Sequence, residues 1–363
     1  MSPETIANRV FRNVRNGCPI ADTAVYVAVP GNENARWLLP AGNSGIDGVL
    51  ANWQPYRLKS RLAWAGVRAA SKIGQVSEIP GSSVLEVEGA RSTDWSELGW
   101  PGNEAPVPVI YLGTPGPRRK AVVHLADRVS GKCRAVVKVP LTDEARVALL
   151  HEAEVLKAMA EARFEWAPRL LHVDHASGIT TQDFVEGQPG SRSLGPEVWR
   201  LLGLLLLPGE TTSLEAHAER WEQGISGAAG AASVASAVEE LRDSTPLPAC
   251  WEHGDFAPWN IKRLSDGRCA LLDWEDARRE GLPLQDAYHF LHIQDYLFEK
   301  RPRSHAAEVV TEAAATMGLT PTQCHKLEAA YLVGAYVRCM QRGNHERARF
   351  VERTLALRGS RSA

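Results

Sequence analysis

The sequence has no long hydrophobic run. Its longest apolar stretch, Leu201 to Leu207, is far shorter than the roughly 20 residues that cross a bilayer. The first twenty residues scatter Arg and Asn through the place where a signal peptide needs an uninterrupted apolar core. We therefore expect no membrane partner and a cytoplasmic location.

The sequence also lacks an excess of one charge, and its cysteines lack the spacing of a disulfide framework or a zinc site. Lys and Arg total 41 against 43 Asp and Glu, a net charge of −2, which argues against a nucleic-acid partner. The 6 cysteines include no CxxC pair, so neither a disulfide framework nor a zinc site is indicated, and we expect reduced thiols. With 44% hydrophobic and 23% charged residues, the composition is that of a globular protein of more than one unit.

Residues 1–105 have the pattern of an accessory α/β segment. Ala24–Pro30 and Arg36–Pro40 are typical of strands that end at proline. Tyr56–Ile73 has helical periodicity, with apolar positions at steps of three and four: Leu58, Leu62, Ala65 and Ala69. Because one amphipathic helix and a few strands bury little area alone, we predict that this stripe packs on the neighbouring lobe.

Residues 106–187 have the pattern of a small β-rich lobe, after a Pro/Gly-dense stretch at Gly99–Pro108. One helix, Glu144–Ala160, is flanked by five predicted strands: Val109–Leu112, Ala121–Leu125, Arg134–Val139, Pro168–Val173 and Ile179–Val185. The remainder, residues 188–363, is predicted to be mainly helical. The fold class is therefore α+β, with an antiparallel β lobe and a helical lobe.

Polar residues interrupt two short apolar runs in the segment Trp251–Ala277. Asn260 follows Asp255 by five positions, and a hairpin across Ser265–Gly267 would return the chain so that Asp273 lies beside Asn260. Phosphoryl transfer from a nucleotide needs oxygen ligands for Mg²⁺ and a carboxylate against the attacking hydroxyl. This spacing satisfies both needs.

These residues carry a resemblance to a known family. His253–Asn260 (HGDFAPWN) resembles the HGDxxxxN catalytic loop of the aminoglycoside phosphotransferase and choline kinase family, and Leu271–Glu275 (LLDWE) resembles its metal-binding segment. The resemblance runs from about Val109 to the C-terminus. It implies a two-lobed protein-kinase-like fold, preceded here by the additional N-terminal segment.

The resemblance also implies roles upstream. Lys138 is similar to the strand lysine that contacts the nucleotide phosphates, with Glu152 as its acidic partner and Glu154 as the alternative. The turn that contains Gly113 and Gly116 is similar in position to the loop that covers the nucleotide, although it lacks a full GxGxxG. Asp183, Phe184 and Val185 resemble the hinge that binds adenine, and Asp286 resembles the aspartate that braces the catalytic loop.

The reaction implied is transfer of the γ-phosphoryl group of ATP, or of GTP as the alternative, to a small-molecule hydroxyl acceptor with the help of Mg²⁺. Asp255 would accept the proton, His253 would order the catalytic loop, and Asn260 and Asp273 would hold the metal. A sugar, an aminoglycoside and an amino alcohol all remain open as acceptors, as does a homodimer.

Rival interpretations remain at this stage. A protein kinase is disfavoured because no APE-like segment follows Asp273, and a catalytically silent regulatory module stays open because the glycine loop is incomplete. His289, His292 and Asp295 fit either an acceptor pocket or a half-buried helix. Trp259 and Trp274 are the tryptophans expected to border a substrate.

Overall fold

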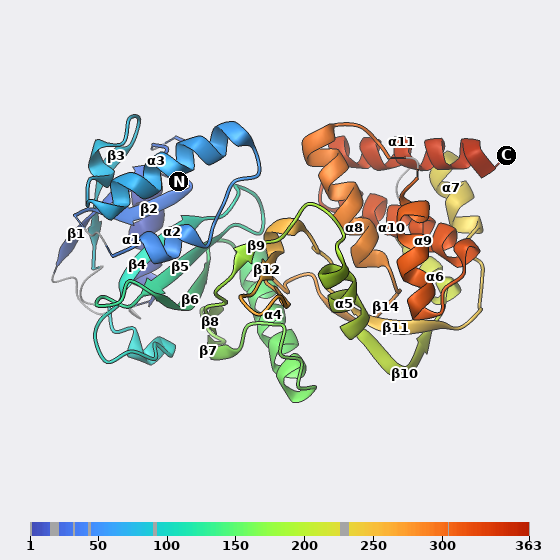
Figure 1. The fold of residues 1–363 in the computed structure, drawn as a ribbon, viewed down its shortest axis with the longest axis horizontal. Coiled ribbons are helices and arrows are strands. Elements are labelled where there is room, and N and C mark those ends of the chain that lie inside the picture. Colours follow the sequence, from blue (N-terminus) through green and yellow to red (C-terminus); the bar gives the residue numbers. More distant parts are fainter. Residues whose placement is uncertain are drawn as a thin grey trace. The chain divides into compact units, whose positions relative to one another are not determined.

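The structure, a computed structural model, describes residues 2–14, 22–31, 33–42, 45–89, 93–225, 232–303 and 305–362 (Figure 1). Cys18 lies outside these residues. The chain forms two compact units, residues 1–189 with 262–266 and residues 190–261 with 267–363. The predicted boundary between residues 105 and 106 falls inside the first unit and stays a prediction.

The first unit is built on an eight-stranded antiparallel sheet in the order β3-β1-β2-β4-β5-β6-β8-β7. Its strands are β1 (Thr23–Val29), β2 (Trp37–Pro40), β3 (Ser83–Glu88), β4 (Val107–Leu112), β5 (Lys120–Ala126), β6 (Cys133–Pro140), β7 (Leu170–Asp174) and β8 (Ile179–Asp183). The seven predicted strands are confirmed, and β3 was not predicted. The N-terminal strands thus continue the sheet of the small lobe.

Helices and short segments complete the unit: α1 (Pro3–Val14), α2 (Asp47–Ala51), α3 (Leu58–Lys72), α4 (Asp143–Glu161), 3-10 turns at Val76–Glu78 and Ser96–Leu98, and the paired strands β9 (Gln188–Pro189) and β12 (Ile261–Arg263). The predicted helix Glu144–Ala160 is α4. It begins where the Thr142 hydroxyl accepts from the Ala145 amide at 3.1 Å, with two acidic residues in the first turn.

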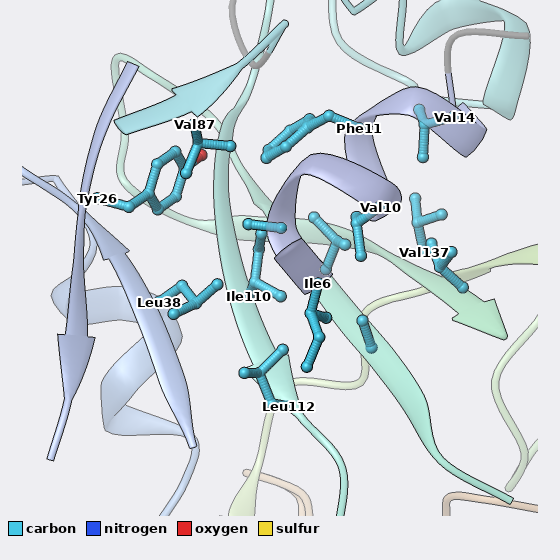
Figure 2. Close-up of a cluster of buried hydrophobic side chains, with 14 of the residues drawn as sticks. Ile6, Val10, Phe11, Val14, Tyr26, Leu38, Val87, Ile110, Leu112 and Val137 are labelled. Carbon is cyan, nitrogen blue, oxygen red and sulfur yellow. The ribbon is translucent and has the colours of Figure 1, made fainter. Parts of the chain in front are cut away.

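Helices cover both faces of the sheet. On one face α1 buries Ile6, Val10, Phe11 and Val14 against strand residues such as Leu38 and Ile110 (Figure 2). On the other face α2 and α3 pack on Trp37 and Val109. Pairing places Val109 opposite His124, Tyr111 opposite Val122, and Val122 opposite Lys138. Residues directly opposite one another share a face, so Lys138 lies on the face of α2 and α3.

The predicted stripe of α3 is wrong. Leu58 is 72% and Leu62 68% exposed, whereas Trp64, Val67 and Ser71 are buried. The Trp64 indole N–H donates to the carbonyl of Leu50 at 3.2 Å and to that of Trp53 at 2.9 Å. A tryptophan can bury more area than any single residue of the predicted stripe and needs a partner for its N–H, so Trp64 determines which side of the helix faces the sheet.

The second unit is mainly helical, as predicted. It contains α5 (Pro196–Leu204), β10 (Leu206–Thr212), α6 (Leu214–Ile225), α7 (Ala232–Glu239), β11 (Leu247–Glu252), β13 (Cys269–Leu271), β14 (Arg278–Gly281), α8 (Gln285–Gln294), a π-turn at Asp295–Glu299, α9 (Ala306–Ala314), α10 (Pro321–Gln341) and α11 (His345–Ser362), with 3-10 turns at Pro258–Asn260 and Ala315–Met317. Every residue of α8 is buried. This helix is the centre of the unit.

Membrane-spanning helices and disulfides were both unexpected from the sequence. Among the described helices, none is both long and apolar enough to cross a membrane. The five cysteines in the described residues form no disulfide.

A substitution in α1 tests how firmly the accessory segment is built into the sheet. Phe11 is fully buried, so Phe11→Ala should lower the free energy of unfolding by about 3–5 kcal/mol. Leu58→Ala, at a 72% exposed position of α3, should change it by less than about 0.5 kcal/mol. Urea unfolding of both variants measures the difference, and equal effects would mean that α1 is not part of the core.

Candidate active site

The loop after β11 is fixed by a buried carboxylate. The Asp286 side chain on α8 accepts from the backbone amides of His253 at 2.7 Å and Gly254 at 3.0 Å. Burial and nearby Glu252 raise the pKa of Asp286, and the two N–H donors oppose this rise. Gly254 has φ +81°, and a Cβ there would lie 2.4 Å from the Asp276 carbonyl oxygen, so only glycine fits this turn.

His253 orders the loop from inside. Its Nε2 lies 2.8 Å from the Leu272 carbonyl oxygen, and its Nδ1 accepts from the Asp255 amide at 3.3 Å. Burial lowers the pKa of His253, which favours the neutral ring. One neutral tautomer, with the proton on Nε2, satisfies both contacts. This geometry fits the scaffold role predicted for His253.

Asp255 presents a carboxylate that is held on both oxygens yet 43% exposed. Oδ2 accepts from the Asn260 side-chain amide at 2.9 Å, and Oδ1 lies 3.2 Å from Nε2 of His289. The Asn260 amide also donates to the Asp255 backbone carbonyl at 2.8 Å. The loop therefore brings Asp255 and Asn260 together, as the motif predicts.

Asp273 arrives beside Asn260 by the predicted return of the chain. β12 and β13 flank the turn, and the Leu272 amide donates to the Asn260 carbonyl at 2.8 Å. Asp273 has φ +63°, a conformation that costs a non-glycine residue of the order of 1 kcal/mol and that collects at functional sites. Its neighbour Trp274 is fully buried and packs 4.8 Å from His253, so the expectation that Trp274 borders a substrate is wrong.

The contact of His289 with Asp255 is what the sequence analysis did not predict. The Nδ1 of His289 lies 3.4 Å from the Tyr331 hydroxyl of α10, while Nε2 faces Asp255. Burial lowers the pKa of His289, and Asp255 opposes this, so a neutral ring can donate through Nε2 and accept from Tyr331. The position three residues after Asp286 on a buried helix was the available signal.

The neighbouring candidates on this helix have structural partners. His292 lies 3.2 Å from Glu328, and Asp295 forms two hydrogen bonds of 2.9 Å with Arg303. Both side chains are about as buried as the core around them. The alternative of a half-buried helix is wrong, because every residue of α8 is buried.

In the first unit, Lys138 and Glu152 form a buried ion pair. Nζ lies 2.7 Å from Oε1 and 2.9 Å from Oε2, and the side chains are 5% and 0% exposed. Glu154 is exposed on the other side of α4. The structure thus distinguishes the two glutamates that the sequence left open.

The loop that contains Gly113 and Gly116 connects β4 to β5. The Gly113 amide donates to the Lys120 carbonyl at 3.0 Å, and a Cβ at Gly113 would lie 2.8 Å from that oxygen. No atom lies within 4 Å of a Cβ built on Gly116. The loop is tied to α4, because the Thr142 hydroxyl donates to the Pro117 carbonyl.

The predicted hinge follows β8. The Asp183 amide donates to the Arg169 carbonyl at 2.9 Å and the Phe184 amide to the Arg134 carbonyl at 3.0 Å. The Asp183 carboxylate accepts from Nε of Arg169 at 2.7 Å. In the described part of the chain the Val185 amide has no acceptor, so its N–H can donate to a ligand.

Magnesium suits the donor set. Both hydrogens of the Asn260 amide are directed at Asp255, which leaves Oδ1 as the atom that can bind a cation. In the described part of the chain, no three His, Cys, Asp or Glu side chains are grouped to hold a metal. Mg²⁺ is usually bound by one or two carboxylates together with water and substrate phosphates, and Asp273 and Asn260 are oxygen donors of the kind such a site uses.

Comparisons with known proteins found similar solved structures and one matching family. Solved structures with similar chains include the macrolide 2′-phosphotransferase MphH from Brachybacterium faecium (18% identity, 68% of this chain and 91% of that chain, TM-score 0.46) and the choline kinase LicA from Streptococcus pneumoniae (14%, 68% and 92%, TM-score 0.46). A thermostable mutant of the aminoglycoside phosphotransferase APH(4)-Ia is similar at 16% identity over 69% and 94%, with a TM-score of 0.47. No curated protein matches the chain.

The sequence match to a family is what decides the assignment. Residues 118–316 match the phosphotransferase enzyme family. They include the loop His253–Asn260, the predicted hinge Asp183–Val185 and the ion pair of Lys138 and Glu152. The resemblance predicted from the sequence is confirmed. Because this match spans more than half of the 363 residues, the chain belongs to the phosphotransferase enzyme family and is a phosphotransferase that acts on hydroxyl groups of small molecules.

Proposed function

We propose that the protein is a small-molecule kinase that transfers the γ-phosphoryl group of ATP, or of GTP, to an acceptor hydroxyl. The observation that carries the proposal is the Asp255 carboxylate, half exposed and held on both oxygens by Asn260 and His289. A carboxylate fixed in this way can orient a hydroxyl and accept its proton. Catalysis of this reaction is mostly positioning and electrostatic stabilisation.

In the proposed step the acceptor oxygen forms a bond to the γ-phosphorus while the bond to the β-phosphate oxygen breaks. The hydroxyl proton passes to Asp255, and a nucleoside diphosphate leaves. Asn260 and Asp273 would hold Mg²⁺, which supplies neutralisation of the phosphate charge when it is bound. Lys138, oriented by Glu152, would bind the α- and β-phosphates of the nucleotide, and the Val185 amide would bind its nucleobase.

The acceptor is proposed at the level of chemical class: a sugar, an aminoglycoside or an amino alcohol. Trp259 in the catalytic loop lies 6.4 Å from Phe298, centroid to centroid, and the Arg192 guanidinium lies 4.4 Å above the Phe298 ring. Aromatic side chains such as Trp259, which belongs to the same loop as Asp255, suit the apolar face of a sugar ring. An ADP-release assay over amino sugars, neutral sugars and amino alcohols separates the three classes.

The assignment of base and metal ligand predicts two different defects. Asp255→Asn should lower kcat at least about a hundredfold while nucleotide affinity is nearly kept, because the amide cannot accept the proton. Asp273→Ala should abolish Mg²⁺-dependent nucleotide binding, measured by calorimetry. Glu312→Gln, at an exposed position of α9, is the control for loss of one negative charge. Wild-type turnover by Asp255→Asn would rule out this base.

The ion pair predicts a ranking of variants on α4. Lys138→Ala should raise the nucleotide KM and reduce kcat, and Glu152→Ala should partly reproduce this. Glu154→Ala is the matched control and should leave both unchanged, because its side chain is exposed. Removal of one partner leaves a buried charge that can cost about 3–5 kcal/mol, so the thermal midpoint is measured for each variant. The reverse ranking of the glutamates would refute the pairing.

His289 is expected to act as a positioning residue. His289→Phe removes the donor to Asp255 and should lower kcat about tenfold or more, with the nucleotide KM nearly unchanged, since a loosened base loses alignment. His289→Gln retains an N–H donor and should recover much of the loss, and Tyr331→Phe should cost only a few-fold. If His289→Phe and His289→Gln lose activity equally and unfold at the same lowered temperature, the role is structural only.

A further inference from the structure

A cavity of about 430 Å³ opens in the first unit, where α1 meets the start of α4. Helix α1 contributes Arg9 and Arg12, and α4 contributes Asp143 and Arg146. Thr142 and Ser177 add hydroxyl groups to the wall. The volume is in the range of sites for small ligands, which begin at about 300 Å³.

The charge of the lining is positive and largely uncompensated. Three guanidinium groups face one carboxylate, and within the described residues Arg9 and Arg12 form no ion pair. Arg146 is held in place because its Nε donates to the Ala176 carbonyl at 3.1 Å and one terminal nitrogen to the His175 carbonyl at 2.8 Å. Its other N–H groups stay available. Guanidinium groups with such freedom bind phosphate oxygens through paired hydrogen bonds.

This cavity is separate from the Lys138 site. Helix α1 packs on the sheet face that carries Val137 and Val139, whereas Lys138 is on the opposite face. Arg9 and Arg12 also lie outside the residues that match the family, 118–316. Arg9 and Arg12 are therefore not part of the site that contains Lys138 and Glu152.

We propose that the cavity binds a small, soluble phosphate ester. The arginines take the phosphate group, and Asp143 with the hydroxyls of Thr142 and Ser177 bonds hydroxyl groups of the same molecule. The site connects to the catalytic machinery through two contacts of Thr142, which caps α4 at the Ala145 amide and donates to Pro117 in the loop between β4 and β5. Glu152 lies on the same helix, about 9 Å along its axis from Arg146.

The test measures binding of ribose 5-phosphate and of inorganic pyrophosphate to the full chain by calorimetry at fixed ionic strength. Arg9→Gln with Arg12→Gln should weaken binding of both probes at least about tenfold, since each charge-assisted contact contributes strongly. Arg9→Lys with Arg12→Lys should retain part of the affinity, because the charge stays and the fork is lost. Circular dichroism verifies that both variants fold.

Two controls make the result decisive. Arg57→Gln with Lys59→Gln removes the same charge from two exposed positions, one directly before α3 and one in its first turn, and should leave ribose 5-phosphate binding unchanged. Lys138→Ala should also leave it unchanged, since that residue belongs to the opposite face. The proposal is overturned if the Arg9 and Arg12 variant binds ribose 5-phosphate as the wild type does, if the α3 control weakens equally, or if Lys138→Ala abolishes binding. None of these outcomes depends on turnover, so the result is independent of the proposed kinase reaction.

Discussion

Every polar group buried at the catalytic loop needs a partner, and this requirement shapes the second unit. Two backbone amides converge on Asp286, and the His253 ring joins the Leu272 carbonyl to the Asp255 amide. An unpaired buried group costs about 1–3 kcal/mol, so few alternative loop shapes are accessible. The exposed carboxylate of Asp255 is the end of this network. The buried side of the loop is thus held by hydrogen bonds, while the Asp255 carboxylate stays accessible. A carboxylate that acts as the proposed base requires both properties.

The catalytic loop was predictable from sequence because its members are close along the chain. Asp255, Asn260 and Asp273 are related by a tight turn and a hairpin, whose geometry follows from residue types such as Gly254 and the Ser265–Gly267 turn. His289 was not, because its contact with Asp255 spans 34 residues. Helical periodicity shows which residues share a face but not what another element places against that face.

The fold itself divides in the same way. Strands and the mainly helical second half were predicted from local alternation and periodicity. The stripe of α3 was predicted on the wrong side, since Trp64 has a larger side chain than Leu58 or Leu62 and its N–H needs the acceptors that it finds on the buried side. Helix α1 was missed although Ile6, Val10 and Val14 recur every four residues.

The accessory segment also solves a problem of the small-lobe sheet. Without β2, strand β4 would be an edge with unpaired backbone groups, and such edges invite aggregation. The segment also forms hydrogen bonds with later parts of the chain. The Asn52 side chain accepts from the Gly187 amide at 3.2 Å, and the Asn52 carbonyl accepts from Lys262. Residues beyond the family match therefore contact the chain directly after the hinge and directly after the catalytic loop.

The buried pair of Lys138 and Glu152 carries a desolvation cost, because both charges are removed from water. Burial of two charges often gives no net stability compared with apolar residues of the same size. The pair is consequently better explained by its effect on the Lys138 ammonium group, which it fixes in position, than by a contribution to stability. Helix α4 meets that demand, since its N-terminus is capped by Thr142 and its middle carries Glu152. A shift of α4 at either end therefore also shifts Glu152, the residue that orients Lys138.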